Sequence, residues 1–366
     1  MKNKYIISSI IIILVLFGLS FSAWLKPESD MSLSERRPLE KFPELSLSTL
    51  LSGDFSSKFE SYATDQFPLR DTFRTFKAIS KFYLFNQKDN NDIYIHDGFA
   101  AKIQNEVSDA SLSNAVSKIT YLYESLIKDK TDKVYLSIIP DKNTYLASQG
   151  KYPSLDYSVI TDKVKSELKF DYIDIFPLLE YTDYYKTDSH WSQDKVTDVA
   201  DALLVGMGKE VTPTFEKITL DNDFFGVYYG QSSLPLPPDR ISYLTSDDIE
   251  NAVVYNYETN KETGVYDMSK LDSKDPYEMF LSGAVSLMKI KNSLNTSGER
   301  LIIFRDSFTS SLAPLLLHAY SEIYLIDTRY IFPQYINAFI GEEVFENADV
   351  LFLYSAPILN ESFSLK

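Results

Sequence analysis

The sequence has no cysteine and only three histidines, His96, His190 and His318, among its 366 residues. The absence of cysteine excludes disulfides, thiolate metal sites, a thiol nucleophile and a lipoprotein anchor. The three histidines leave few ways to build an acid–base or metal site. With 12 glycines, 15 prolines and 44% hydrophobic residues, the composition is that of a globular protein, neither disordered nor fibrous.

Positive charge is also scarce. The chain has 36 Lys and Arg residues against 52 Asp and Glu residues, a formal net charge of −16. Nucleic acid is therefore not expected as a partner, because its phosphate backbone requires a basic surface. The same charge mildly disfavours strongly anionic polymers as substrates.

One long run without charged side chains occupies the N-terminus. Residues 5–25 follow Lys2 and Lys4, and the acidic Glu28 and Asp30 come soon after. About 20 apolar residues in a helix cross a hydrocarbon core of about 30 Å. Lysines before the run predict a cytoplasmic N-terminus and an exported remainder. We therefore expect residues 1–25 to be a transmembrane signal-anchor, with a cleaved signal peptide as the alternative. Outside the cytoplasm no nucleotide cofactor is expected.

The remaining chain falls into a short region and a long one. Residues 26–89 are expected to be a juxtamembrane spacer with helices between 55 and 85, which Pro68 divides. From residue 90 to 366, apolar strands alternate with amphipathic helices, which predicts an α/β domain with a mostly parallel sheet and helices on both faces. The strands are expected at 93–95, 134–139, 172–176, 301–304, 322–326 and 350–354, and the helices at 111–127, 159–168, 195–207 and 309–320. The polar stretch 211–297 breaks this rhythm, and we expect an irregular insertion there, outside the sheet strands.

The segment Thr187-Asp188-Ser189-His190-Trp191-Ser192 is the first that could carry chemistry. A carboxylate two residues before a histidine, at a loop-to-helix junction, can orient the imidazole and stabilise its protonated form. In the alternative interpretation, Asp188 or Ser192 caps the following helix and His190 only packs.

The second segment is the apolar run 301–304, which leads through Arg305 and Asp306 into Ser307 and then into a predicted helix. A strand–turn–helix arrangement of this kind exposes a nucleophilic serine at the carboxyl edge of an α/β sheet. A plain helix-capping serine is the alternative. Neither segment has the glycines of a GxSxG elbow, which disfavours the α/β-hydrolase fold.

The two segments together supply nucleophile, base and orienting carboxylate, the complete set for acyl transfer. Loops after different strands of a parallel sheet converge at one edge, so the long sequence separation between His190 and Ser307 is no obstacle.

Several spaced motifs, in order, resemble those of the bacterial DHHW proteins, relatives of the SGNH-hydrolase-like alginate O-acetylation proteins. They are TDSHWS, FRDSF, the N-terminal anchor and the juxtamembrane run SERRPLEKFPELS…SGDFSSKFESYATDQFPLRD, and the resemblance covers roughly residues 32–355. It implies an SGNH-like fold with Ser307 as nucleophile, His190 as base and Asp188 as its orienter. It also implies a cell-surface polysaccharide as substrate and a multipass membrane O-acyltransferase as partner. One departure is Ser189, which replaces the first histidine of the Asp-His-His-Trp motif.

Further candidates for the site are weaker. The N–H of Ser307 is an expected oxyanion donor, and Gly226, Gly230 or Gly283 could give a second, although each could be a plain turn residue. Lys142 follows a strand at the same edge and could touch a ligand. Three more residues complete the set: Arg329, which could meet a sugar or pair with Asp327, its neighbour Tyr330, and Trp191, which could stack on a sugar or pack beneath His190. No metal is expected, although a zinc site with Asp188, His190 and a remote ligand is conceivable.

These features predict an exported, serine-dependent O-acetyltransferase or acetylesterase that acts on a cell-envelope polysaccharide. The altered DHHW motif and the uncertain oxyanion hole leave a second interpretation open, a non-catalytic glycan-binding or scaffold protein of a polysaccharide-modification complex.

Overall fold

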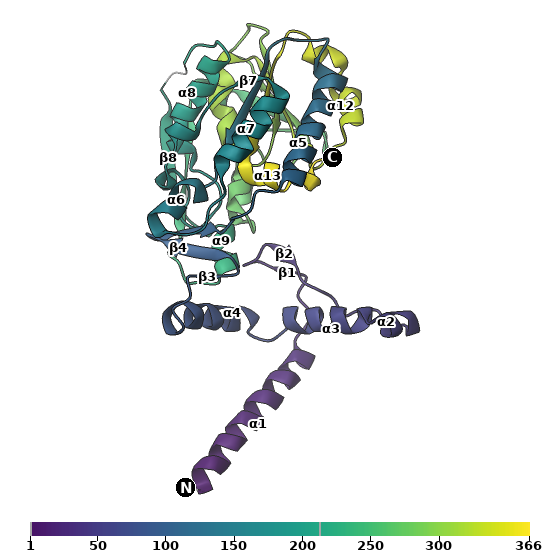
Figure 1. Ribbon diagram of the computed structural model, residues 1–366, viewed down its shortest axis with the longest axis vertical. Helices are drawn as coiled ribbons and strands as arrows, with labels where there is room; N and C mark the ends of the chain where they lie inside the picture. The colour runs from purple at the N-terminus through teal and green to yellow at the C-terminus, as the bar shows by residue number, and fades with distance from the viewer. Residues whose placement is uncertain (1, 212–213) are drawn as a thin grey trace. The chain divides into compact units, whose positions relative to one another are not determined.

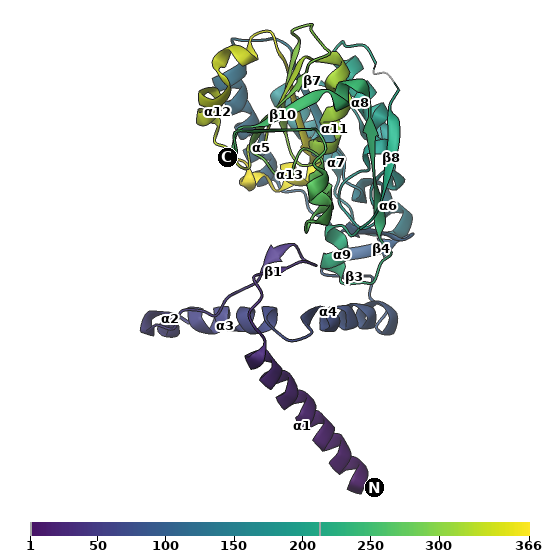
Figure 2. The ribbon, with the colours of Figure 1, turned by 180° about the vertical axis from the view of Figure 1, so that it is seen from behind.

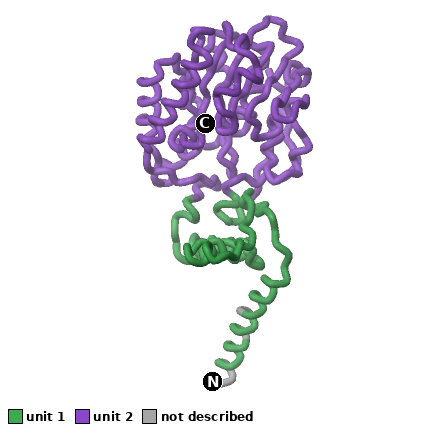
Figure 3. The backbone as a smooth tube through the Cα atoms, turned by 90° about the vertical axis from the view of Figure 1, so that its right-hand side faces the viewer, with its two compact units in different colours: residues 1–92, 229–236 green, residues 93–228, 237–366 purple. Residues whose placement is uncertain are grey.

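The computed structural model describes residues 2–211 and 214–366. The chain divides into two compact units (Figure 3). Residues 1–92 together with 229–236 form the first unit, and residues 93–228 together with 237–366 form the second. The short return segment 229–236 therefore belongs with the N-terminal region, although it lies far along the sequence.

The first unit is mainly helical. It starts with α1 (Lys2–Leu25), in which Tyr5–Leu25 is long and apolar enough to cross a membrane. A two-residue hairpin, β1 (Met31–Ser32) and β2 (Arg37–Pro38), precedes the later helices. These are α2 (Leu47–Ser52), α3 (Asp54–Asp65) and α4 (Arg70–Ile79) with its π-helical continuation η1 (Ser80–Leu84). The short strand β3 (Asp89–Asn90) follows η1. The later helix α9 (Val227–Ser232) also ends in this unit.

Two sequence features set the helix ends of the first unit. Ser46 caps α2 by accepting the N–H of Thr49, and α2 ends at Gly53, whose φ of 82° suits glycine. Pro68 lies between α3 and α4, so the predicted break in the helical region is confirmed.

The second unit is built on an eight-stranded sheet in the order β11-β10-β12-β14-β13-β15-β6-β7. The strands from β14 to β7 pair in parallel, whereas β11, β10 and β12 add on in antiparallel fashion. Their bounds are β6 Val134–Ile139, β7 Asp171–Tyr172, β10 Ala252–Asn256, β11 Lys261–Thr263, β12 Leu287–Asn292, β13 Arg300–Arg305, β14 Glu322–Ile326 and β15 Asp349–Ser355. Every residue of β15 is buried, as expected for a central parallel strand.

Helices cover both faces of this sheet, and the predicted mostly parallel α/β class is confirmed (Figures 1 and 2). One core contains Ile303 and Leu351 with residues of α8 (Thr197–Gly206) and the 3₁₀ helix η8 (Ala313–Ala319). The other contains Ile302 and Val350 with residues of the remaining large helices: α5 (Asp109–Leu122, continued by η2, Tyr123–Ile127), α7 (Tyr157–Leu168) and α12 (Pro333–Ile340). Neighbouring strand residues thus serve opposite cores.

Smaller elements surround the sheet. There are two hairpins, β4 (Ile93–His96) with β5 (Phe99–Lys102) and β8 (Glu216–Phe224) with β9 (Asp239–Thr245). The short helices are α6 (Asn143–Gly150), α10 (Asp247–Glu250), α11 (Thr309–Leu312), α13 (Ala356–Asn360), η3 (Phe176–Leu178), η4 (Tyr181–Asp183), η5 (Gln193–Lys195), η6 (Met268–Asp272), η7 (Pro276–Met279), η9 (Glu342–Phe345) and η10 (Ser362–Ser364).

Three sequence expectations need correction. Residues 211–297 are not outside the sheet, because β10, β11 and β12 come from this stretch. The strand expected at 172–176 is limited to β7, and a 3₁₀ turn follows at Phe176. The helix expected at 309–320 is a single α-turn that continues as 3₁₀ helix, with Pro314 near its start.

Candidate active site

Ser307 lies in the turn directly after β13, before α11. Asp306 shapes this turn, because one carboxylate oxygen accepts the N–H of Phe308 (3.1 Å) and the other accepts the N–H of Ser355 at the end of β15 (2.7 Å). The buried guanidinium of Arg305 donates to the Ser310 hydroxyl (2.8 Å). The carboxyl end of two adjacent central strands thus fixes the serine.

His190 lies in a loop that is closed by an isolated β-bridge between Tyr184 and Trp191. Its imidazole connects the two candidate segments. Nδ1 lies 2.6 Å from a carboxylate oxygen of Asp188, and Nε2 lies 2.8 Å from the hydroxyl of Ser307. Because a carboxylate only accepts, Nδ1 carries the proton and Nε2 is left to accept from the serine. Sequence analysis predicted this trio, and the structure brings all three residues together.

The Asp188 carboxylate is fully buried and saturated with donors. Besides the His190 ring, it accepts the backbone N–H of His190 (3.0 Å) and that of Val227 (2.8 Å). Three fixed donors leave the carboxylate one orientation, and that orientation aims the imidazole at Ser307.

The histidine ring is also held by aromatic neighbours. Tyr277 stacks on it with ring centroids 4.0 Å apart and an interplanar angle of 11°, and Phe308 packs at 4.9 Å. The Tyr277 hydroxyl lies 2.9 Å from the Ser311 hydroxyl, which also accepts from the indole N–H of Trp191 (3.0 Å). Burial raises the pKa of Tyr277 well above its ordinary value, so its hydroxyl stays protonated. One hydroxyl of α11 therefore ties together the aromatic residues around His190.

The structure gives Gly226 a different role from the predicted oxyanion donor. Its N–H donates to the Thr187 hydroxyl (2.9 Å), so it is not available to a ligand. A Cβ at this position would overlap the Cα and Cβ of Asp188 and the carbonyl oxygen of Thr187. Gly226 is therefore a close-approach position that supports the Asp188 carboxylate.

Lys142 also supports the loop 184–191 that carries His190, here called the histidine loop. Its ammonium is buried and donates to the carbonyl oxygens of Ala100 and Asp188, each at 2.7 Å. Burial lowers its pKa to about 7, although the nearby carboxylates of Asp188, Asp239 and Asp141 oppose the shift. An ammonium enclosed in this way is not exposed to touch a ligand, which was one possibility raised by the sequence.

The remaining candidates lie outside this cluster of contacts. Arg329 makes a two-point ion pair with Asp327 (2.9 and 2.6 Å), the alternative that sequence analysis left open, while Tyr330 is 54% exposed. Trp191 is fully buried, so it packs rather than presenting a face to a sugar. Gly230 belongs to the first unit, where its carbonyl accepts from Arg74, and Gly283 is a turn residue with a φ of 88°. Within residues 2–211 and 214–366, no group of three His, Asp or Glu residues could hold a metal ion.

Sequence reasoning missed Asp306, Tyr277, Ser311 and Asp239. Asp239 accepts the backbone N–H groups of Lys186 and Thr187, both at 2.8 Å, and so holds the start of the histidine loop. Only Asp306 had a signal in the sequence, its place between the strand and the serine. The other three act through contacts between distant segments.

No protein-family profile matches the sequence, and no curated protein does. Solved structures do match. A DHHW family protein from Eubacterium siraeum superposes with a TM-score of 0.59 at 20% identity, covering 74% of this chain and 93% of that one. The chain has the fold of a DHHW family protein. Bacillus cereus PatB1 gives a TM-score of 0.57 at 17% identity, over 73% of this chain and 96% of PatB1. PatB1 with a sulfonyl adduct gives 0.54 at 17% identity, over 73% and 95%. The predicted resemblance and the SGNH-like fold are thus confirmed as statements about fold.

Proposed function

We propose that this chain is a serine-dependent O-acetyltransferase or acetylesterase that modifies a cell-envelope polysaccharide through an acetyl-Ser307 intermediate. The observation that carries the proposal is the continuous line of contacts from Asp188 through His190 to Ser307, with 2.6 Å and 2.8 Å at its two links. Acyl transfer by a serine uses three groups in line: a buried carboxylate, an imidazole that it orients, and the serine hydroxyl.

The proposed mechanism has two halves. His190 Nε2 takes the Ser307 hydroxyl proton while the oxygen attacks the acetyl carbonyl, and the protonated imidazole then gives that proton to the leaving alcohol. In the second half, His190 deprotonates a sugar hydroxyl or a water, whose oxygen attacks the acetyl-serine and restores the free enzyme. Asp188 holds the imidazole and stabilises its protonated form throughout.

The backbone N–H of Ser307 is the proposed oxyanion donor. No acceptor for it is present among the described residues, so it is available to a developing negative charge. With Gly226 engaged by Thr187, one candidate second donor is removed, and loss of one oxyanion donor costs about 10²–10³ in rate. This favours a slow catalyst.

We further propose a location and a partner. α1 would be an uncleaved single-pass anchor, residues 26–89 a juxtamembrane region, and residues 90–366 a catalytic domain outside the cell. At the outer surface no acetyl donor of the cytoplasm is at hand, so a multipass membrane O-acyltransferase is the proposed source of acetyl groups. The length and composition of α1 support the anchor.

The decisive experiment compares wild type with Ser307→Ala, His190→Ala and Asp188→Asn on a nitrophenyl acetate. We expect Ser307→Ala and His190→Ala each to lower kcat/KM by roughly 10⁴-fold or more, Asp188→Asn to cost less, and the double changes to add little. Activity of the wild type should also fall as pH decreases, because His190 must be neutral to accept the proton. A sulfonyl fluoride should modify Ser307, as read by peptide mass spectrometry, and the reaction should require His190.

A folded Ser307→Ala protein with wild-type turnover would falsify the acyl-serine mechanism. The second candidate function, a non-catalytic glycan-binding or scaffold protein, would then take its place. Ser189 at the first histidine position of the motif and the engaged N–H of Gly226 are the observations in its favour.

A further inference from the structure

Residues 26–92 of the first unit expose large apolar side chains about four times as densely as the second unit. Thirteen such side chains are exposed across the described part of the second unit, which is about four times as long as residues 26–92. Monomeric proteins rarely leave such a concentration of apolar surface uncovered. Residues 26–92 expose fourteen: Leu33, Phe42, Leu45, Leu47, Leu50, Leu51, Phe59, Leu69, Phe73, Phe76, Ile79, Tyr83, Leu84 and Phe85.

Helical spacing places some of these side chains on one side of α4. Phe73 and Phe76 are three residues apart within this helix, which puts them on one face. Ala78, half a turn away from that face, is buried. The segment 70–84 also has four basic residues and one acidic residue; Arg70 and Arg74 are engaged by Glu35, so Lys77 and Lys81 give its surface a basic character. An apolar face with a basic polar side is typical of helices that lie in a membrane interface.

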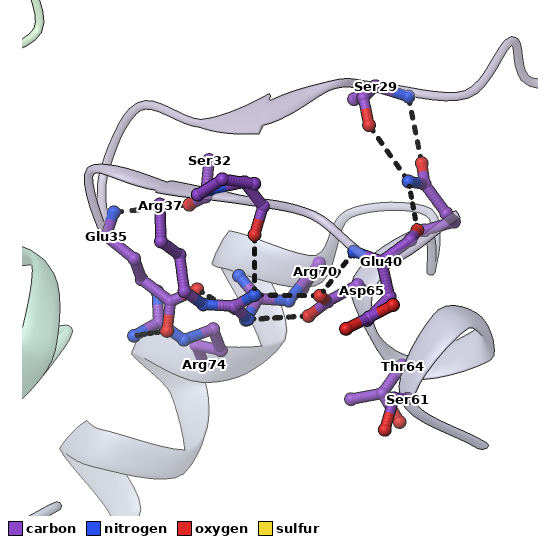
Figure 4. A network of polar contacts seen from close by, with 12 residues as sticks. Ser29, Ser32, Glu35, Arg37, Glu40, Ser61, Thr64, Asp65, Arg70 and Arg74 are labelled. Atoms are coloured by element: carbon purple, nitrogen blue, oxygen red, sulfur yellow. Dashed lines mark hydrogen bonds and ion pairs between the residues drawn. The ribbon is translucent and has the colours of Figure 1, made fainter. Parts of the chain in front are cut away.

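The three helices α2, α3 and α4 follow one another in a row (Figures 1 and 2). A network of partly buried ion pairs joins α3 and α4 to the β1–β2 hairpin (Figure 4). Arg37 forms a two-point pair with Asp65 at the end of α3 (2.8 and 2.6 Å), and Glu35 accepts from Arg70 (2.6 Å) and Arg74 (3.0 Å) of α4. The hairpin, α3 and α4 are therefore held as one piece.

A second set of contacts ties this piece to the end of α1. The side chain of Gln66 accepts the N–H of Ser29 and donates to its carbonyl, both at 2.9 Å, and also donates to the carbonyl of Glu40 (3.0 Å). Ser29 comes only four positions after Leu25, the last residue of α1. A fully extended chain of four residues spans at most about 14 Å. Because Gln66 lies between α3 and α4 and is bonded to Ser29, the junction of these two helices stays close to the end of α1.

We propose that α2, α3 and the α4–η1 helix lie in the interface of the membrane that α1 spans, with their exposed apolar side chains buried in the lipid. The proposal rests on the proposed membrane anchor. The headgroup region on each side of a bilayer is about 5–8 Å thick, so a 14 Å tether cannot carry the helix row far from the lipid surface. Lys77 and Lys81 of the α4–η1 segment can extend toward the headgroups while their stems stay in the apolar region.

Lipid is favoured over a protein partner by the distribution of the side chains. Most of them are spread along a row of helices, from Leu51 in α2 through Phe59 in α3 to Leu84 at the end of η1, while Leu33 and Leu69 line a separate pocket. A flat, chemically uniform partner suits such a surface, and the bilayer is the partner that the tether brings within reach.

The test uses the absence of native cysteine, which makes the full-length chain a clean background for single labels. Spin labels are placed at Phe76→Cys and Leu51→Cys on the proposed lipid face, at Ser61→Cys on the hairpin side of α3 as control, and at Ile12→Cys within α1. The protein is reconstituted in liposomes of phosphatidylethanolamine and phosphatidylglycerol. Relaxation by oxygen, which concentrates in lipid, is compared with relaxation by a water-soluble nickel chelate.

We expect labels at positions 76 and 51 to be severalfold more accessible to oxygen than to nickel, at a depth of about 5–10 Å, and the label at 61 to show the opposite. If position 12 lies in the bilayer while 76 and 51 behave like 61, the interface proposal is wrong and the anchor stands. If position 12 is also open to nickel, anchor and interface fail together. If 76 and 51 are aqueous in liposomes but shielded from both reagents in native membranes, a membrane protein covers this surface and the lipid proposal is overturned. None of these readings depends on Ser307.

Discussion

The two halves of the candidate active site are held in place by different means. Ser307 is positioned by the backbone of the sheet, since it follows β13 directly and its turn is tied to the end of β15 through Asp306. His190 lies in an irregular loop whose position depends on contacts from four separate segments: the side chains of Lys142, Asp239 and Tyr277, and the backbone N–H groups of Gly226 and Val227. Ser307 thus shares the rigidity of the core, whereas the position of His190 depends on a few individual contacts.

The contrast predicts its largest effect at Gly226. In Gly226→Ala, the new Cβ must displace the Asp188 backbone, and the imidazole moves with its carboxylate. A displacement of about 1 Å can cost about 10²-fold in rate, so we expect a loss of this size in kcat/KM on a nitrophenyl acetate. Gly264→Ala is the matched control, because a Cβ there meets nothing within 4 Å. Wild-type activity in Gly226→Ala would show that the histidine loop tolerates movement, and it would contradict the view that His190 depends on these few contacts.

The next change, Lys142→Met, is expected to lower the free energy of unfolding and to reduce kcat/KM less than Gly226→Ala does. The change leaves the buried carbonyls of Ala100 and Asp188 without their donor, which costs about 1–3 kcal/mol for an unsatisfied group. It also has a signature in pH. The lysine pKa of about 7 in the folded protein lies below the value of about 10.4 in the unfolded chain. The unfolded state therefore binds more protons between these values, and this residue makes stability increase with pH across that window.

Thermal unfolding at pH 7 and pH 10 checks that sign. The stability difference between wild type and Lys142→Met should shift in favour of the wild type at the higher pH. No change in the difference between the two pH values would mean that the ammonium is not destabilised by its surroundings.

Among these changes to supporting residues, the smallest effect on turnover is expected for Asp306, which holds the turn before Ser307. In Asp306→Asn, the amide can no longer accept both the N–H of Phe308 and that of Ser355, so we expect a stability loss of about 1–3 kcal/mol in denaturant unfolding. Because β13 pairs with β14 and β15 on its two sides, Ser307 should stay near its place, and kcat should fall less than in Gly226→Ala. An equal or larger loss of kcat would mean that the serine is no better anchored than the histidine.

The same contrast explains what the sequence could predict. The run 301–304 is apolar throughout and leads to Ser307, so the buried strand and the serine at its carboxyl end follow from local pattern alone. Asp188 and His190 are two residues apart, and their contact is also local. The supports of the histidine loop are not local. Thr187 meets Asp239 across 52 positions and Trp191 meets Ser311 across 120, and no periodicity encodes such pairs.

The strands β10 and β12 were missed for another reason. In β12, Met288 and Ile290 are buried while Lys289 and Lys291 face outward, which is the two-residue period of a half-covered strand. The polar character of the surrounding stretch obscured this alternation. A search restricted to continuous apolar runs finds the central strands and overlooks those at the antiparallel edge.

The place of β15 in the sheet also has a consequence for the order of events during biosynthesis. β15 is the last strand along the chain, yet it lies between β13 and β6, at the heart of the sheet. A chain that is synthesised from its N-terminus therefore delivers His190 and Ser307 before the strand that joins β13 to β6. Until residue 355 has emerged, Asp306 lacks its Ser355 donor and the two sides of the core cannot close. A stalled or truncated chain that lacks β15 should therefore carry every residue of the proposed triad and yet remain inert.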